Sequence, residues 1–139
     1  MQIDTTTDYG KRVERRLREE TIVWLTTVRS DGTPQPTPVW FLWDGASVLM
    51  YSRPNQQKER NITRNPKVSL NFDGDGHGGN IIIITGEAHV VADAPPATEV
   101  PEYVAKYAEP IKRIGMDDAT FAQTYSVAIR ITPTDVRGH

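Results

Sequence analysis

Residues 52–61, with the sequence SRPNQQKERN, combine side chains that suit the binding of a phosphate group. A predicted strand ends at Ser52 and a helix is predicted to follow, so the first N–H groups of that helix have no partners and form its positive end. Ser52 adds a hydroxyl and Lys58 an ammonium group, and Asn61 shares a helical face with Lys58. Five basic residues and one acidic residue lie between positions 52 and 67. The segment is interpreted either as a phosphate site or as a solvated basic helix.

The three tryptophans, Trp24, Trp40 and Trp43, belong to two adjacent extended segments. Trp40 and Trp43 are three residues apart, so they project to opposite faces of a strand. Packing within the core or at a dimer contact explains Trp24 and Trp43 best. Trp40 is also well placed to contact a flat aromatic ligand.

The sequence contains partial matches to other functional motifs, but the residues around each match do not fit the motif. Residues 74–79, GDGHGG, match a dinucleotide-binding fingerprint in letters, but the apolar run that follows predicts a strand where the motif needs a helix. A calcium loop would need an acidic residue where Ile84 stands. The three histidines are scattered, so no metal site is expected, and no nucleophile elbow or P-loop is present. Because no catalytic motif is present, the sequence predicts no catalytic residue, and the catalytic residues are unknown.

Composition limits the classes of protein that fit. A chain of 139 residues predicts one domain, residues 1–139. The absence of cysteine excludes disulfides, thiolate metal centres and thiol nucleophiles. A net charge of −2 gives no reason to expect a nucleic-acid partner, and no apolar run is long enough to span a membrane. The N-terminal residues do not resemble a secretory signal, so a cytoplasmic location is expected.

The first half of the chain predicts a helix followed by a meander of strands. An amphipathic helix is expected at about 8–20, and strands at 22–28, 35–44 and 48–51. Pro36 and Pro38 lack backbone donors, which predicts a sheet edge, a bulge or the start of a strand. A short helix over 56–64 follows, with Asn55 as its expected N-cap.

The second half predicts further strands and two helices. Strands are expected at 68–72, at 81–84 continuing to 91 with a bend at Gly86, and at 126–132. The run 81–84 is apolar at every position, which predicts burial on both faces. Helices are expected over 97–114 and 117–124, the first with a core-facing stripe of Val100, Val104, Tyr107 and Ile111. Six strands without regular strand–helix alternation predict a mostly β fold, a small barrel with peripheral helices.

Two stretches, IVWLTTVRSDGTPQPTPVWFLWDG at 22–45 and VLMYSRPNQQKERNITRNPKVSLNFDGDG at 48–76, resemble the flavin and deazaflavin split-barrel oxidoreductases related to pyridoxamine 5′-phosphate oxidase. The resemblance runs from about residue 12 to residue 139 and is strongest to the actinobacterial branch that uses the deazaflavin coenzyme F-420. It implies a six-stranded split β-barrel, the FMN-binding fold of that family, and a homodimer with cofactor sites at the subunit interface.

The resemblance also implies which residues hold the cofactor. It places around the phosphate-bearing tail Ser52, Arg53, Gln57, Lys58 and Asn61, and around the ring Pro38, Val39, Trp40 and Tyr51. FMN-using relatives commonly have Ser-Arg-Lys where this chain has Gln56-Gln57-Lys58, which favours coenzyme F-420 over FMN.

The function implied is hydride transfer between reduced F-420 and an unsaturated or quinone-like small molecule. Because the cofactor carries the hydride, the protein needs no nucleophile of its own. Tyr51 and solvent are the candidates for supplying a proton. The alternatives are an FMN-dependent oxidase or reductase of the same fold and a non-catalytic module that binds flavin or haem.

Overall fold

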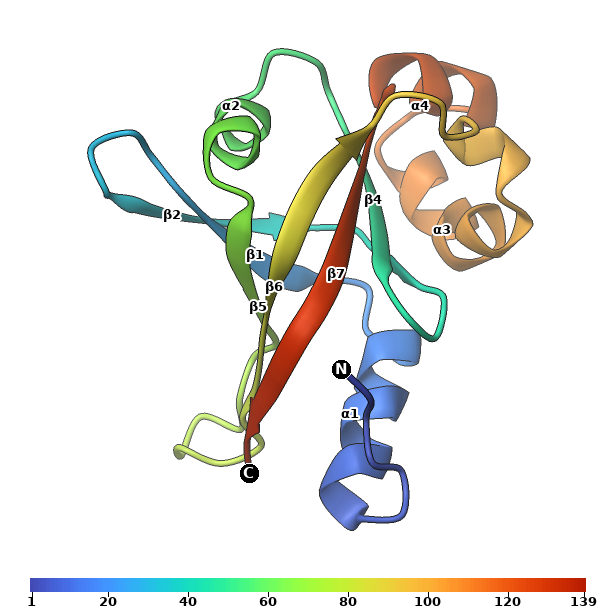
Figure 1. Cartoon of the computed structure of the whole chain (residues 1–139). Coiled ribbons are helices and arrows are strands. Elements are labelled where there is room, and N and C mark those ends of the chain that lie inside the picture. The colour runs from blue at the N-terminus through green and yellow to red at the C-terminus, as the bar shows by residue number, and fades with distance from the viewer.

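Seven strands form one curled antiparallel sheet in the computed structural model, which describes residues 1–139 (Figure 1). Their order across the sheet is β2-β1-β5-β6-β7-β4-β3. The strands are β1 (Val23–Val28), β2 (Pro34–Val39), β3 (Leu42–Trp43), β4 (Val48–Ser52), β5 (Lys67–Asn71), β6 (Ile82–Val91) and β7 (Val127–Gly138). The helices are α1 (Asp8–Glu19), α2 (Gln57–Arg64), the 3-10 turn η1 (Ala97–Glu99), α3 (Pro101–Arg113) and α4 (Asp118–Thr124). The mostly β architecture with peripheral helices is confirmed, with seven strands instead of the expected six.

The additional strand arises because the expected strand 35–44 is interrupted at Trp40 and Phe41. The Phe41 N–H donates to the hydroxyl of Tyr107, and the Phe41 carbonyl accepts from both Tyr107 and Lys106. Side chains of α3 thus take the backbone groups that would otherwise continue the ladder, and β2 and β3 become separate strands. β2, which carries Pro36 and Pro38, lies at one edge of the sheet, as their missing backbone donors require.

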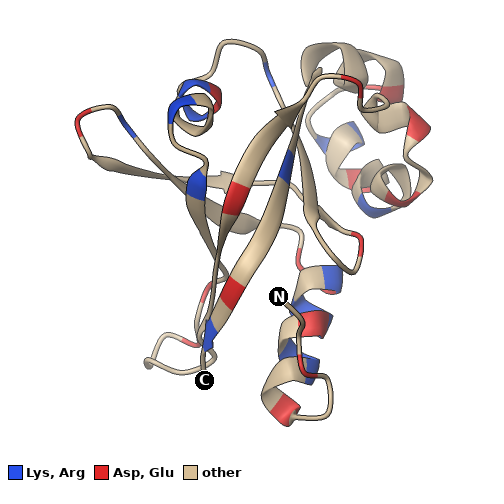
Figure 2. Ribbon diagram, in the orientation of Figure 1, with Lys and Arg blue, Asp and Glu red and all other residues tan.

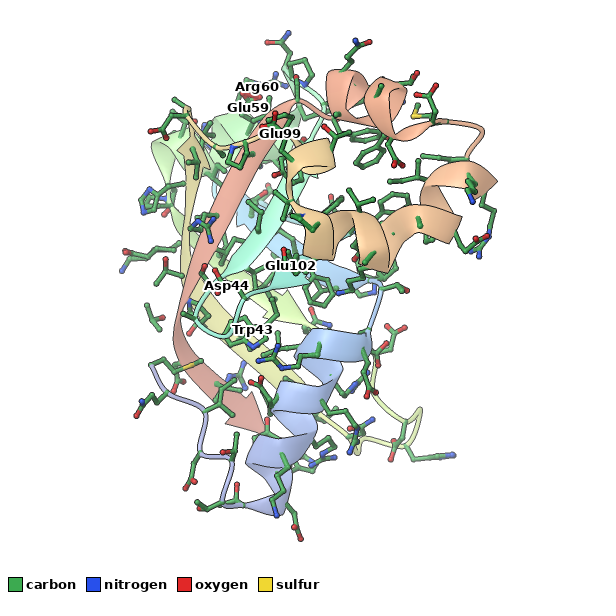
Figure 3. The ribbon with its side chains drawn as sticks, turned by 90° about the vertical axis from the view of Figure 1, so that its right-hand side faces the viewer. Trp43, Asp44, Glu59, Arg60, Glu99 and Glu102 are labelled. Atoms are coloured by element: carbon green, nitrogen blue, oxygen red, sulfur yellow. The ribbon has the colours of Figure 1, made fainter.

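The concave face of the sheet encloses the main hydrophobic core. Alternate residues of each strand point inward, among them Leu25, Leu70 and Ile84, each 1% exposed. Val13 and Leu17 of α1 close one side of this core. Figure 3 shows Trp43 next to α1, where its indole N–H donates to Glu14 at 3.2 Å. Trp43 is therefore a core residue, as expected from packing.

Within the single chain, the strand that is buried on both faces is β4, whereas residues 81–84, for which burial on both faces is predicted, are fully covered on one face only. Every residue of β4 is buried, with Val48 and Met50 facing the main core and Leu49 and Tyr51 facing α3 and α4. In contrast, Ile81 and Ile83 are only half-buried in the single chain. The difference follows from the helix pair packing on the outer face of β4 (Figure 1).

The two longest strands, β6 and β7, pair along their whole lengths. The register shifts between Thr85 and Gly86, and a side chain at Gly86 would lie within 2.6 Å of the Thr132 carbonyl oxygen, which explains the glycine at the predicted bend. β7 continues to Gly138, beyond the expected end at residue 132, because β6 offers it a partner over that whole length.

The helices match their expected positions with changes at their ends. α1 is capped by the Thr7 side chain and α4 by that of Asp117. The expected helix 97–114 is divided into η1 and α3, and the buried stripe of α3 is Tyr103, Tyr107 and Ile111 instead of one that includes Val104. None of the helices is long and apolar enough to cross a bilayer.

Candidate functional site

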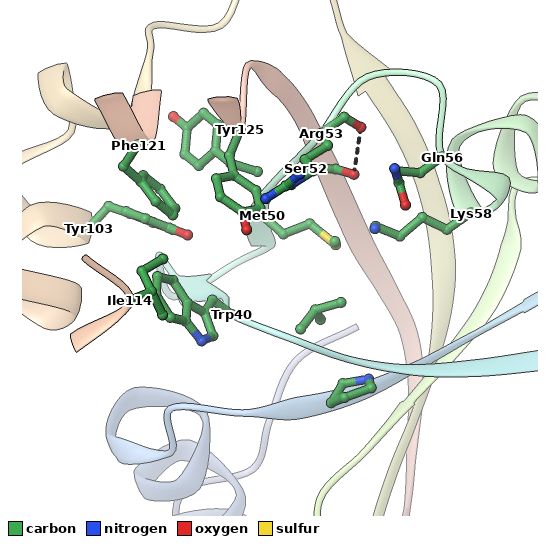
Figure 4. Close-up of a pocket in the computed structure, with 13 residues that line it drawn as sticks. Trp40, Met50, Ser52, Arg53, Gln56, Lys58, Tyr103, Ile114, Phe121 and Tyr125 are labelled. Carbon is green, nitrogen blue, oxygen red and sulfur yellow. Dashed lines mark hydrogen bonds between the residues drawn. The ribbon is translucent and has the colours of Figure 1, made fainter. Parts of the chain in front are cut away.

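A cavity of about 370 Å³ lies between β4, the residues that lead from β2 into β3, the start of α2 and the helix pair α3 and α4 (Figure 4). This volume is near the lower end of the range of about 300–1,000 Å³ that is typical of small-molecule sites. Its lining residues are Pro38, Val39, Trp40, Met50, Tyr51, Ser52, Arg53, Gln56, Lys58, Tyr103, Ile114, Phe121 and Tyr125. The cavity has a polar end from β4 and α2 and an aromatic end from α3 and α4.

The polar end is positioned where β4 leads into α2. Ser52 is 1% exposed, and its hydroxyl donates to the Arg53 carbonyl at 3.0 Å. Lys58 is half-buried and makes no ion pair, and its burial lowers the pKa of the ammonium group. A bound anion would relieve that unfavourable burial. Basic residues also mark α2 and the loop before it in Figure 2.

The start of α2 has no side-chain cap. Gln56, and not the expected Asn55, occupies the N-cap position, and it makes no capping hydrogen bond. Asn55 instead has a left-handed backbone, with φ of 63°, and its N–H donates to Glu59 at 3.1 Å. The first-turn N–H groups of α2 therefore stay available to water or an anion.

Aromatic rings form a continuous stack along the other end of the cavity. Trp40 stacks on Tyr107 with ring centroids 4.8 Å apart and on Phe121 at 5.5 Å. Phe121 stacks on Tyr125 at 4.6 Å, and the Arg53 guanidinium lies 5.2 Å from the centre of the Tyr125 ring. Such a wall favours a flat, conjugated ligand.

Most of the residues predicted for the cofactor meet at this cavity, and two do not. Pro38, Val39, Trp40, Tyr51, Ser52, Arg53 and Lys58 all line it. Gln57 and Asn61 lie outside its lining, where the Gln57 amide donates to the Asn61 side chain at 2.9 Å. Asn61 has no exposed surface and donates to Thr27 and Gln35, both at 2.9 Å. In this chain Asn61 fastens α2 to the sheet.

Sequence reasoning missed several lining residues, namely Met50, Gln56, Tyr103, Ile114, Phe121 and Tyr125. The four-residue spacings of Tyr103 with Tyr107 and of Phe121 with Tyr125 indicate one aromatic face on each helix. Only the packing of those helices against β4 brings these faces to the cavity. No group of three or more His, Asp or Glu side chains lies close enough together to hold a metal ion.

Comparison with known proteins decides the family. The family model described as pyridoxamine 5′-phosphate oxidase matches residues 10–139, nearly the whole chain. The chain belongs to this family. The resemblance to this family that the sequence indicates is therefore confirmed. The family has a flavin-binding oxidoreductase fold, and its members are generally oxidoreductases.

The solved structures that are similar to this chain include proteins that are named for different ligands. An F-420 reductase is 27% identical, with 89% of this chain and 94% of that chain covered and a TM-score of 0.71. A FAD-binding protein from Mesorhizobium loti is 18% identical, with 88% of each chain covered and a TM-score of 0.65. The haem storage protein HutZ from Vibrio cholerae is 15% identical, with 99% and 95% covered and a TM-score of 0.63. The last two support the fold alone. A search of curated proteins finds no match.

Proposed function

We propose that this protein is a reductase that depends on coenzyme F-420 and acts on an unsaturated or quinone-like small molecule. The observation that carries the proposal is the position of Lys58, a half-buried cation that forms no salt bridge, at the polar end of an aromatic-walled cavity. The likeness to an F-420 reductase over 89% of the chain supports the choice of cofactor.

The residues of the cavity fit a phosphorylated cofactor with a flat ring. Ser52, Arg53, Lys58 and the uncapped N–H groups of α2 would hold the phosphate-bearing tail. Pro38, Val39, Trp40 and Tyr51 would contact the ring. When bound, the deazaflavin supplies the hydride, while the chain binds and orients the reactants and excludes water between apolar walls.

The choice of F-420 over FMN rests on the residues before Lys58. Gln56 lines the cavity, and at positions 56 and 57 this chain has neutral amides where FMN-using relatives commonly carry serine and arginine. This chain therefore lacks the arginine that FMN-using relatives commonly carry before the lysine, which favours F-420 over FMN. FMN is the runner-up cofactor.

We also propose that two copies of the chain form a homodimer, with cofactor sites near the interface. Trp24, Asn71 and Ile83 occupy paired positions across β1, β5 and β6 and are all half-buried. Trp24, Ile81 and Ile83 give partly exposed apolar surface on the outer face of the sheet, with the polar Asn71 between Trp24 and Ile83, and a second copy would cover this patch. The expected cytoplasmic location remains a prediction.

The activity is tested by mixing the purified protein with reduced F-420 and a panel of quinones and cyclic enones, and following cofactor oxidation by absorbance. Turnover that depends on the protein supports the proposal. Turnover with reduced FMN alone would favour the FMN alternative. Tight F-420 binding without turnover on a broad panel would favour a non-catalytic binding module.

A further inference from the structure

Two tyrosines on adjacent turns of α3 have opposite hydrogen-bonding states. Tyr103 and Tyr107 each have no exposed surface, and their ring centroids are 4.9 Å apart. The Tyr107 hydroxyl accepts from the Phe41 N–H at 2.7 Å and lies 2.8 Å from the Thr21 carbonyl and 2.9 Å from the Phe41 carbonyl. The Tyr103 hydroxyl has no partner, and it is the one buried side-chain polar atom in the protein in that state.

The position of Tyr103 offers a reason for the missing partner. Tyr103 lines the cavity, and in Figure 4 its hydroxyl points from α3 into the group of lining side chains. The surrounding rings of Tyr51 and Phe121 leave it no protein acceptor. A buried hydroxyl without a partner is costly, and native proteins rarely retain one unless something else satisfies it.

The chemistry of the hydroxyl defines the ligand group that would satisfy it. Burial raises the pKa of Tyr103 well above its usual value, so the group stays protonated at all ordinary pH values and acts as a hydrogen-bond donor. Tyr51, the other candidate in the cavity, already donates to the Pro95 carbonyl at 2.8 Å. Trp40 and Tyr125 also have donors without a protein partner, but both side chains are partly exposed, so water can satisfy them. Tyr103 is therefore the one fully buried donor of the cavity lining without an acceptor, which suits a carbonyl oxygen on a flat ring.

We infer that Tyr103 is a specificity-determining residue that donates a hydrogen bond to a ring carbonyl of the acceptor, so that the acceptor is a quinone or a cyclic enone. The inference rests on the proposed function and narrows its substrate class. In hydride transfer to such a ring, negative charge develops on the carbonyl oxygen, and a neutral donor fixed at that oxygen stabilises it.

The test compares Tyr103→Phe with Tyr107→Phe, a matched pair in which each change removes one hydroxyl from the same helix. Calorimetric titrations use menadione, which has two ring carbonyls, and 2-methylnaphthalene, which has none, with the full chain alone and loaded with oxidised F-420. Tyr103→Phe should bind menadione at least tenfold more weakly than wild type and bind 2-methylnaphthalene equally well. Its melting temperature should equal or exceed that of wild type, whereas Tyr107→Phe should melt at a lower temperature.

Unchanged menadione affinity in Tyr103→Phe, or no menadione binding by wild type in either form, would overturn the inference. A fall in melting temperature as large as that of Tyr107→Phe would also overturn it, because it would reveal a structural hydrogen bond. A separate titration of wild type with F-420 alone decides the proposed cofactor, so failure of the cofactor and failure of the Tyr103 assignment give different results.

Discussion

Asn61 and Thr27 are joined by a buried hydrogen bond, in which the Asn61 side-chain amide donates to the Thr27 hydroxyl at 2.9 Å. Both residues are almost fully buried, at 0% and 1% exposure. The bond connects α2 to β1, and the second bond from Asn61 to Gln35 connects α2 to β2. These contacts set the position of the helix whose first turn forms the polar end of the cavity.

Replacing Asn61 by alanine should therefore reduce stability. Asn61→Ala leaves the buried Thr27 hydroxyl without its donor, and we expect the free energy of unfolding to fall by about 1–3 kcal/mol. Chemical denaturation monitored by tryptophan fluorescence measures the change. Gln123→Ala serves as a control, because it removes an exposed side-chain amide that makes no hydrogen bond. A stable Asn61→Ala protein that has lost cofactor binding would instead place Asn61 at the ligand.

Replacing Lys58 by alanine should weaken the binding of F-420. Loss of a charge-assisted hydrogen bond to phosphate costs about 1–3 kcal/mol, or roughly a 5- to 150-fold rise in Kd. Lys67→Ala is the control, because it removes the same charge from an exposed site outside the cavity and should change Kd little. Fluorescence titration of the three proteins measures the difference. Equal affinity in wild type and Lys58→Ala would exclude the phosphate role of Lys58.

F-420 binding should depend on pH through the same lysine. Burial lowers the pKa of Lys58 in the free protein, and a bound phosphate favours the charged form and raises it again. Binding therefore takes up protons, and affinity should fall as the pH rises through the lowered pKa of free Lys58 towards the ordinary lysine value. Lys58→Arg stays charged throughout and should give a flatter profile. Parallel profiles for the two proteins would argue against titration of Lys58.

An acidic residue at position 83 should separate the proposed dimer. Wild type should have about twice the chain mass of 15.6 kDa by light scattering, and Ile83→Glu should have the mass of one chain. The substitution places a charge in the patch of Trp24, Asn71 and Ile83, where its burial against a second copy is unfavourable. His89→Glu, an exposed site six residues further along β6, should remain dimeric. Monomeric wild type at micromolar concentration would refute the dimer.

Those parts of the fold that depend on the backbone properties of single residues could be predicted from the sequence. Proline placed β2 at an edge, and the bend at Gly86 followed from one residue that allows close approach of β7. The interruption at Phe41 was not predictable, because it depends on Tyr107 sixty-six residues later. The double burial of β4 was missed for a similar reason, since it requires α3 and α4 to pack on its outer face.

In the candidate site too, residues close together in the sequence could be predicted, and residues brought in by the packing of distant elements could not. Residues from β4, the start of α2 and residues 38–40 were predicted at the site because they are close in the sequence or fit the family pattern. Tyr103, Phe121 and Tyr125 enter it from helices whose docking no local pattern predicts. Asn61 shares a helical face with Lys58, but its amide turns to Thr27 and not to the cavity, which spacing alone does not indicate.

Parallel titrations of the purified protein with oxidised F-420 and with FMN test the central claim most directly. The account predicts saturable binding of one F-420 per chain, with a Kd at least tenfold lower than that for FMN, and a loss of affinity in Lys58→Ala. A protein that is yellow as purified and binds FMN more tightly than F-420, or that binds neither, would contradict it.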